Sequence, residues 1–298
     1  MGLMKTLGLG LLGAATIAMA VFDHTATAAE RSASRIVAIG GSVTEIVYAL
    51  GAEDRLVGRD STSTYPEAAR KLPDAGYIRA LSPEGVLSLN PDLILMLDGA
   101  GPPPALDAIK AAGVPTAVIP DGYDRNAVVN KIEAVGKAIG EETKAHDLAA
   151  RVEASLNAAV AASDAGERKA RVLFILSMQG GKIMAAGSDN HADGIIRLAG
   201  GENVLSGIKG YKPVSDEAVI KAAPDVVLTM SGGGDHTVQD KAVLANAAIA
   251  STPAGKAGKI IRLDGAYLLG FGPRTADAIA TLHKALYPAS EAKPGTGE

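Results

Sequence analysis

The residue types that most often carry out covalent chemistry are sparse or unpaired in this sequence. Cysteine is absent, which excludes disulfides, thiol catalysis and cysteine-held metals. The five histidines are scattered, and no G-x-S-x-G or H-E-x-x-H motif occurs. Gly40-Gly41-Ser42 superficially resembles a phosphate loop but lacks the P-loop lysine. The sequence therefore gives little support for an enzyme.

The side chains that could bind a ligand lie in polar or glycine-rich loops. Tyr77 and Arg79 follow Gly76 and precede Ser82-Pro83, a pair typical of a helix start. Aromatic residues make up only 3% of the chain, so each loop tyrosine is a candidate for a specific role. From spacing alone, an ordinary loop tyrosine beside a solvated arginine is the simpler interpretation.

The segment that follows Tyr77 occurs twice in the chain. LSPEGVLSLNPDLILM at 81–96 matches VSDEAVIKAAPDVVLT at 214–229. A second pair, SVTEIVYALGAEDRLVG at 42–58 and HADGIIRLAGGENVLSG at 191–207, recurs in the same order. Because the period is about half the chain, the repeats predict two related lobes and not a solenoid.

Short apolar runs alternate with segments of helical period in both halves. Buried strands are expected at 35–39, 56–58, 93–97, 116–119 and 171–176. This alternation predicts an α/β fold, with a parallel sheet in each lobe covered by helices on both faces. Ligands of such sheets bind beyond the carboxyl ends of the strands, so we expect a ligand cleft between the lobes.

A long helical segment separates the two halves. Apolar residues recur at helical spacing from Ala127 to about Ala162, with Gly136 and Gly140 as possible interruptions. We expect a rigid connecting helix at 127–167, between an N-terminal lobe at 30–126 and a C-terminal lobe at 168–298.

The first residues have the pattern of a secretory signal peptide. Lys5 precedes an apolar run, and Ala26-Thr27-Ala28 fits an A-x-A cleavage site. The run is shorter than the roughly 20 residues that span a membrane. We therefore expect a signal peptide at 1–29 and a mature protein in a bacterial periplasm. The net charge of -4, with both signs mixed, gives no support for nucleic-acid binding.

The order of these segments resembles the periplasmic substrate-binding proteins of metal-chelate ABC importers. The similarity runs through IVAIGGSVTEIVYALGAEDRLVG, LSPEGVLSLNPDLIL, the long connector and the second related lobe, so it covers essentially the whole mature chain. It implies two α/β lobes joined by a long helix, with haem, a ferric siderophore or cobalamin bound between them. GYIRALSPEG is similar to the haem-binding branch, in which a tyrosine of this loop ligates the haem iron.

By this resemblance Tyr77 is the axial ligand of the haem iron. A phenolate oxygen is a hard donor that suits ferric iron, and tyrosine ligates haem in catalase. A nearby cation favours the charged phenolate, so Arg79 is expected beside Tyr77 or on a haem propionate.

Further haem contacts are expected from other loops. On the face opposite the tyrosine, the candidates in order are Met178, His191 and His236. Each has an ordinary alternative, namely a packing methionine, a residue at a helix start and a surface histidine. Arg59 and Arg274 are candidates for the propionates, although both suit structural roles as well.

Glu84 and Glu217 occupy the same place in the two copies of the repeat, near a helix start. The helix dipole alone favours a carboxylate there. In the resembling family, one such glutamate per lobe docks onto arginines of the membrane permease. The resemblance therefore implies delivery of haem to an ABC permease of the inner membrane, with an outer-membrane haem receptor system upstream.

Two alternatives stay open at this point. A ferric siderophore or cobalamin would bind to the same fold without an iron-ligating tyrosine. An exported α/β hydrolase would need a nucleophile with a histidine partner, which the sequence does not show. We expect a binding protein that catalyses nothing.

Overall fold

The structure is a computed structural model that describes Met1 and residues 33–164, 168–232 and 238–288. The described residues from Ala33 onward belong to one compact unit by their internal contacts. Apart from Met1, the signal peptide predicted at 1–29 lies outside the described residues. Within the described ranges, no helix is long and apolar enough to cross a membrane.

The first sheet consists of four parallel strands in the order β2-β1-β5-β6. Alternate residues of β1 pack into two different cores, because helices cover both faces of the sheet. The strands are β1 (Ile36–Ile39), β2 (Leu56–Arg59), β5 (Leu93–Leu97) and β6 (Thr116–Ile119), close to the expected runs. Between them lie α1 (Gly41–Ala49), η1 (Glu53–Arg55), η2 (Glu67–Lys71), the strand pair β3 (Gly76–Tyr77) and β4 (Ala80–Leu81), α2 (Pro83–Leu87) and α3 (Pro103–Ala111).

The second sheet is mixed, whereas the sequence predicted a parallel one. Its path is β10-β8-β7-β11-β12, with β9 paired to β7. The pairings of β8 with β7 and β10 are antiparallel, because β7 turns back through Gly180-Gly181 into β8. The strands are β7 (Arg171–Gln179), β8 (Lys182–Ala186), β9 (Glu202–Asn203), β10 (Tyr211–Val214), β11 (Val226–Ser231) and β12 (Ile260–Asp264). Their helices are α6 (His191–Leu198), α7 (Asp216–Ala222), α8 (Asp240–Ala245), α9 (Ala247–Ser251), α10 (Pro253–Ala257), α11 (Gly265–Leu269) and α12 (Thr275–Leu286).

The repeated segments of the sequence fold in the same way in both sheets. Ser82 caps α2 by accepting a hydrogen bond from the N–H of Gly85 at 3.3 Å. Ser215 caps α7 by accepting one from the N–H of Ala218 at 3.2 Å. In each copy the capped helix leads into a buried strand, β5 or β11. The local prediction from the serine spacing is therefore confirmed.

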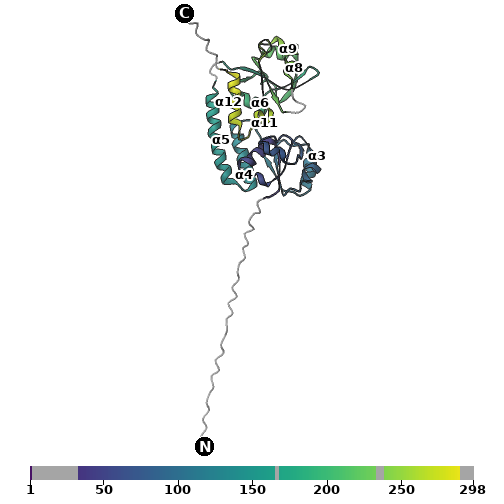
Figure 1. Cartoon of the computed structure of the whole chain (residues 1–298), viewed down its shortest axis with the longest axis vertical. Coiled ribbons are helices and arrows are strands. Elements are labelled where there is room, and N and C mark those ends of the chain that lie inside the picture. Colours follow the sequence, from purple (N-terminus) through teal and green to yellow (C-terminus); the bar gives the residue numbers. More distant parts are fainter. Residues whose placement is uncertain (2–32, 165–167, 233–237, 289–298) are drawn as a thin grey trace. The chain divides into compact units, whose positions relative to one another are not determined.

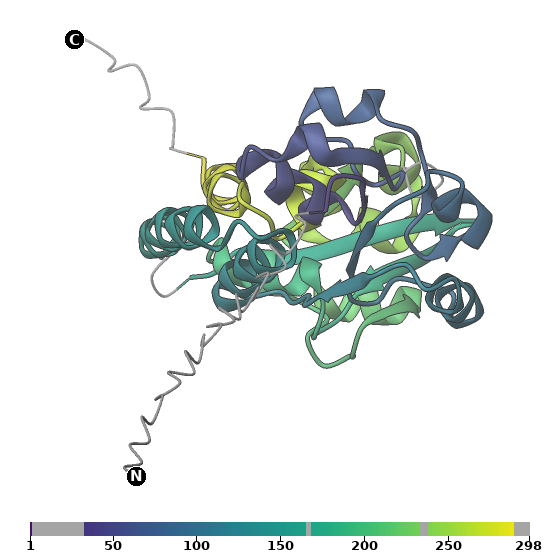
Figure 2. The same cartoon turned by 90° about the horizontal axis from the view of Figure 1, so that it is seen from below.

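The segment expected to be one connecting helix contains two. Helix α4 (Arg125–Ile139) ends at Gly140, whose φ of 73° is left-handed, and α5 (Glu142–Ala162) follows. The two helices pack against each other at Gly136, where an added Cβ would lie 2.0 Å from the Cβ of Ala145. Figures 1 and 2 show α5 running beside α12, with which it is in contact.

The largest hydrophobic core joins elements of both sheets. It contains residues of β1 and β5, of β7 and β11, and of the helices α1, α4, α5, α6 and α12. A second core belongs to the second sheet, and a third lies under α2 and α3 of the first. Each sheet therefore has one face on a core of its own and the other on a shared core.

Candidate functional site

Tyr77 lies on a short hairpin that exposes it to solvent. It pairs with Ala80 across the β3–β4 turn, and its side chain is 42% exposed. Arg79 lies in the turn and is also exposed. The neighbouring loop holds the hairpin, because Gly101 donates its N–H to the carbonyl of Ile78 at 2.9 Å and accepts from Leu81 at 2.9 Å. The hairpin thus presents a phenol and a guanidinium together.

The base of this hairpin is tied to the loop that follows β2. Ser61 donates its N–H to the carbonyl of Gly76 at 2.9 Å. The guanidinium of Arg59 lies 2.7 Å from a carboxylate oxygen of Asp74, and the arginine side chain is largely buried. Arg59 therefore has a structural partner, and its predicted contact with a haem propionate stays a prediction.

Tyr211 in the second sheet lies near this hairpin and was missed by sequence reasoning. Its ring meets the ring of Phe174 edge-on, with the two centroids 6.3 Å apart. Burial raises the pKa of the Tyr211 phenol to about 12, although the charge on Arg79 acts in the opposite direction. The signal that could have found it is Gly210-Tyr211, which precedes α7 much as Gly76-Tyr77 precedes α2.

Met178 is placed where a packing role is sufficient. It lies in β7, opposite Ile183 of β8, and packs against the core of the second sheet. The methionine is thus in a strand and not in the loop that the sequence suggested. His236 lies outside the described residues, so its predicted haem contact is untested.

His191 begins α6 and is engaged with the loop that leads into α4. Its Nε2 lies 3.0 Å from Oδ2 of Asp121, and its ring meets Tyr123 and Phe271 edge-on. Burial alone would raise the pKa of the Asp121 carboxyl, but the hydrogen bond from His191 and the charge on Lys131 hold that pKa well below its usual range. His191 therefore has a carboxylate partner, and its predicted contact with haem stays a prediction.

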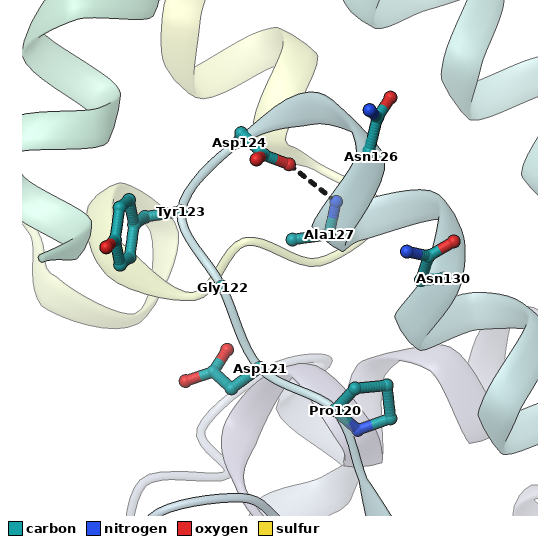
Figure 3. Close-up of a pocket in the computed structure, with 8 residues that line it drawn as sticks. All are labelled: Pro120, Asp121, Gly122, Tyr123, Asp124, Asn126, Ala127 and Asn130. Atoms are coloured by element: carbon teal, nitrogen blue, oxygen red, sulfur yellow. Dashed lines mark hydrogen bonds between the residues drawn. The ribbon is translucent and has the colours of Figure 1, made fainter. Parts of the chain in front are cut away.

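The same loop lines a pocket of about 350 Å³. Figure 3 shows Asp121 and Tyr123 on this loop and Asp124 capping α4, with a hydrogen bond of 2.8 Å from the N–H of Ala127. The residues that line the pocket are Pro120, Asp121, Gly122, Tyr123, Asp124, Asn126, Ala127 and Asn130. None of the residues predicted to contact haem is among them.

Lys131 of α4 is fully buried, which is unusual for a lysine. Its ammonium donates to Oδ1 of Asp121 at 2.8 Å, to the hydroxyl of Ser42 at 3.2 Å and to the carbonyl of Gly270 at 3.4 Å. Burial lowers the pKa of the ammonium, and the charges of Asp121 and Glu45 partly offset this effect. These contacts connect α1, α4 and the loop after α11.

Arg274 forms an ion pair with Glu45 of helix α1, which lies on the side of the first sheet. Its Nε and a terminal nitrogen donate to Oε2 of Glu45 at 3.0 and 2.9 Å, and its backbone N–H donates to Oε1 at 3.1 Å. Its guanidinium carbon lies 3.5 Å from the ring centroid of Tyr65. The predicted role of Arg274 on a propionate stays a prediction, and the contacts that it makes are structural.

Glu84 and Glu217 both lie exposed in the first turn of a capped helix. The backbone N–H of Glu217 and the hydroxyl of Ser215 lower the pKa of the Glu217 carboxyl. Both glutamates are thus free to meet a partner surface, as the docking hypothesis requires. Among the described residues, no group of three or more His, Cys, Asp or Glu could hold a bare metal ion.

This arrangement suits binding of a small ligand at the carboxyl ends of strands more than it suits catalysis. Residues 36–267 match the family model described as periplasmic binding protein. The chain belongs to the periplasmic binding protein family. The predictions of the family and of a two-lobed α/β fold are therefore confirmed.

Several substrate-binding and ligand-binding proteins are similar to this one over most of their length. The structure of the periplasmic haem-binding protein BhuT in complex with two haems matches with a TM-score of 0.79 and 42% identity, over 85% of this chain and 97% of that one. The uncharacterized ABC transporter substrate-binding lipoprotein YvrC of Bacillus subtilis (strain 168) is 27% identical over 262 residues, 87% of this chain and 82% of that protein. The vitamin B12-binding protein of Vibrio parahaemolyticus serotype O3:K6 (strain RIMD 2210633) is 28% identical over 210 residues, 70% of this chain and 75% of that protein.

These relatives place the chain among substrate-binding proteins that work outside the cytoplasm. The matched family and the fold are those of substrate-binding proteins, a class whose members are not enzymes.

Proposed function

We propose that this protein binds haem in the periplasm and delivers it to an ABC importer of the inner membrane. The observation that carries the proposal is Tyr77, which lies exposed beside Arg79 on a hairpin fixed at both ends. An exposed phenol on a well-held hairpin is accessible to a ferric iron, for which a phenolate oxygen is a suitable hard donor. The 42% identity to a haem-binding protein supports the same ligand.

Arg79 has a second use in this proposal. Its guanidinium is exposed, and its charge reaches Tyr211 of the second sheet. Haem carries two propionates, and a guanidinium binds a carboxylate through two parallel hydrogen bonds. Arg79 therefore suits a propionate of a haem whose iron is held by Tyr77.

The partner that receives haem is a permease of the inner membrane. Glu84 and Glu217 start matched helices of the two repeats, and such a pair suits the two arginine-bearing subunits of a permease dimer. A signal peptide at 1–29 would direct the protein to the periplasm, and an outer-membrane haem receptor system would supply the ligand. No catalytic step is part of this function.

Cobalamin is the second candidate, because a vitamin B12-binding protein is 28% identical to this chain. A ferric siderophore is the third candidate within the same fold. Neither ligand needs a tyrosine on its metal, which is cobalt in cobalamin and iron in the siderophore complex, so the effect of Tyr77 on binding distinguishes haem from both.

The test is an absorption titration of the purified mature protein with hemin, with cyanocobalamin and a ferric siderophore as competitors. The wild type should bind hemin saturably with a ferric tyrosinate-type spectrum, and Tyr77→Phe should lose that spectrum. Tyr48→Phe, a tyrosine of α1 outside the site, is the matched control and should bind as the wild type does. Absence of saturable hemin binding by the wild type, or displacement of hemin by cyanocobalamin at equal concentration, contradicts the proposal.

A further inference from the structure

Arg274 and Glu45 form an ion pair that joins helix α1, on the side of the first sheet, to the segment before α12, on the side of the second sheet. Glu45 lies in α1, directly after β1 of the first sheet, and Arg274 directly precedes α12, after β12 of the second. Three nitrogens of the arginine donate to the two carboxylate oxygens at 2.9 to 3.1 Å. The carboxylate is 10% exposed and the guanidinium 23%. A pair with several charge-assisted hydrogen bonds and little exposure holds its partners more firmly than a surface salt bridge does.

The same guanidinium also holds the loop that follows β2. The guanidinium carbon lies 3.5 Å from the ring centroid of Tyr65 and stacks on that ring. It lies 5.2 Å from the ring centroid of Tyr267, which belongs to the side of the second sheet. Tyr65 is 44% exposed, so the guanidinium covers only part of its surface. We name the set Arg274, Glu45 and Tyr65 the Arg274 junction.

The loop that carries Tyr65 is connected to the Tyr77 hairpin by a hydrogen bond of Ser61. The loop carrying Tyr65 is fixed by Asp60, which is fully buried and accepts from the N–H of Gly40 at 2.9 Å and from the hydroxyl of Ser63 at 2.7 Å. One residue on, Ser61 donates its N–H to the carbonyl of Gly76, the residue before Tyr77. Movement of the Tyr65 loop would therefore move the hairpin.

A second contact reinforces the junction. The loop from Gly270 to Arg274 lies directly on α1, because a Cβ added to Gly272 would be 3.2 Å from the Cβ of Ser42. Buried Lys131 bridges the hydroxyl of Ser42 and the carbonyl of Gly270. The approach of this loop to α1 is therefore close-packed as well as charge-paired.

We propose that Arg274 is a positioning residue that holds the Tyr77 hairpin at a fixed distance from the second sheet, so that both sides of the ligand site are in place before the ligand arrives. The part of this inference that concerns the ligand rests on the proposed function. In this role Arg274 acts through Glu45 and Tyr65, the two side chains that its guanidinium contacts. Preorganisation of this kind improves affinity because binding no longer orders the site.

The test measures the distance between the two sheets directly. The chain has no cysteine, so Lys110→Cys in α3 and Lys241→Cys in α8 give one spin label on each side without background. Pulsed electron–electron double resonance then gives the distribution of distances between the two spin labels, with and without hemin. Arg274→Gln is compared with Arg151→Gln, an exposed arginine of α5.

The wild type and Arg151→Gln should each show one narrow distribution that hemin leaves unchanged. In Arg274→Gln the distance distribution should be broader, and hemin should narrow it again. The hemin Kd of this variant should rise about ten-fold, while the absorption spectrum of its hemin complex stays the same. Arg274→Lys keeps the charge but not the fork, so it should fall between the two. A narrow distribution and an unchanged Kd for Arg274→Gln would overturn the inference.

Two further outcomes keep this inference separate from the proposed function. If the wild type binds no hemin, the proposed function fails, while the distance distribution without ligand still decides whether Arg274 fixes the two sides. If Arg274→Gln does not fold by circular dichroism, Tyr65→Leu takes its place. That variant keeps the ion pair and loses the stack, and a distribution as narrow as that of the wild type would count against the junction.

Discussion

Replacement of Lys131 by methionine should destabilise the protein by about 3 kcal/mol. Removal of one partner from a buried ion pair costs roughly 3–5 kcal/mol, because the other charge stays buried. Lys131 is fully buried, and without its ammonium Asp121 would keep the side chain of His191 as a hydrogen-bond partner. The low end of the range applies, since methionine fills the volume of the lysine stem and the burial of the ammonium no longer opposes folding.

Urea unfolding followed by circular dichroism measures this loss. For a chain of this size, 3 kcal/mol corresponds to a fall in Tm of about 6–12 °C. Lys137→Met is the matched control, because Lys137 lies exposed on the same helix and its loss should change stability by less than about 0.5 kcal/mol. Adding Asp121→Asn to Lys131→Met should cost less than the sum of the single changes. A Lys131→Met variant as stable as the wild type would refute the assignment of Lys131 to a stabilising network.

The pH dependence provides a second readout of the same substitution. Because burial lowers the pKa of the Lys131 ammonium below 10.5, the unfolded chain binds more protons than the folded one between the two pKa values. Lys131 therefore makes the free energy of unfolding of the wild type rise as the pH rises between these two pKa values. Lys131→Met lacks that gain, so the stability difference between the two proteins should widen toward alkaline pH. A difference that narrows there would contradict the direction of the shift.

Three other predictions follow from separate parts of the structure. The pKa of Tyr211 is raised from 10.0 to about 12. Its contribution to the free energy of unfolding is therefore present below pH 10 and is lost as the pH rises through about 12. Tyr211→Phe should lose less stability than the wild type over this alkaline range, as measured by circular dichroism. Charge reversal of both Glu84 and Glu217 should weaken association with the permease about ten-fold or more and leave the hemin Kd unchanged, as measured by surface plasmon resonance on permease nanodiscs. Gly136→Ala should cost about 1–3 kcal/mol in urea unfolding, because its Cβ would overlap that of Ala145; an unchanged midpoint would show that the helices adjust freely.

Local features of the fold could be predicted from the sequence because their causes are local. Ser82 and Ser215 cap helices for reasons contained within four residues, and the buried strands follow from apolar runs. The break in the connector was indicated by Gly140, yet the packing of α4 on α5 was not. That packing depends on Gly136 meeting Ala145, a contact across the turn that helical periodicity does not reveal.

The polar contacts between the two sheets could not be predicted, because their partners are far apart in the sequence. Arg274 pairs with Glu45 at a separation of 229 residues, and Lys131 reaches Gly270 across 139. Sequence patterns assigned Arg274 to a ligand because a loop arginine suits a carboxylate of either origin. Only the tertiary structure shows that the carboxylate of Glu45 lies beside Arg274, and the contact of Arg274 with a haem propionate stays a prediction.

We propose that the oxygen of Tyr77 binds the iron of haem, and resonance Raman spectroscopy of the ferric complex is the most direct test of this bond. Excitation in the charge-transfer band enhances the ring modes of an iron-bound phenolate and of no other tyrosine. We expect these modes in the haem complexes of the wild type and of Tyr48→Phe, and we expect Tyr77→Phe to lose them. Persistence of the phenolate modes in Tyr77→Phe, or their absence from the wild-type complex, would contradict it.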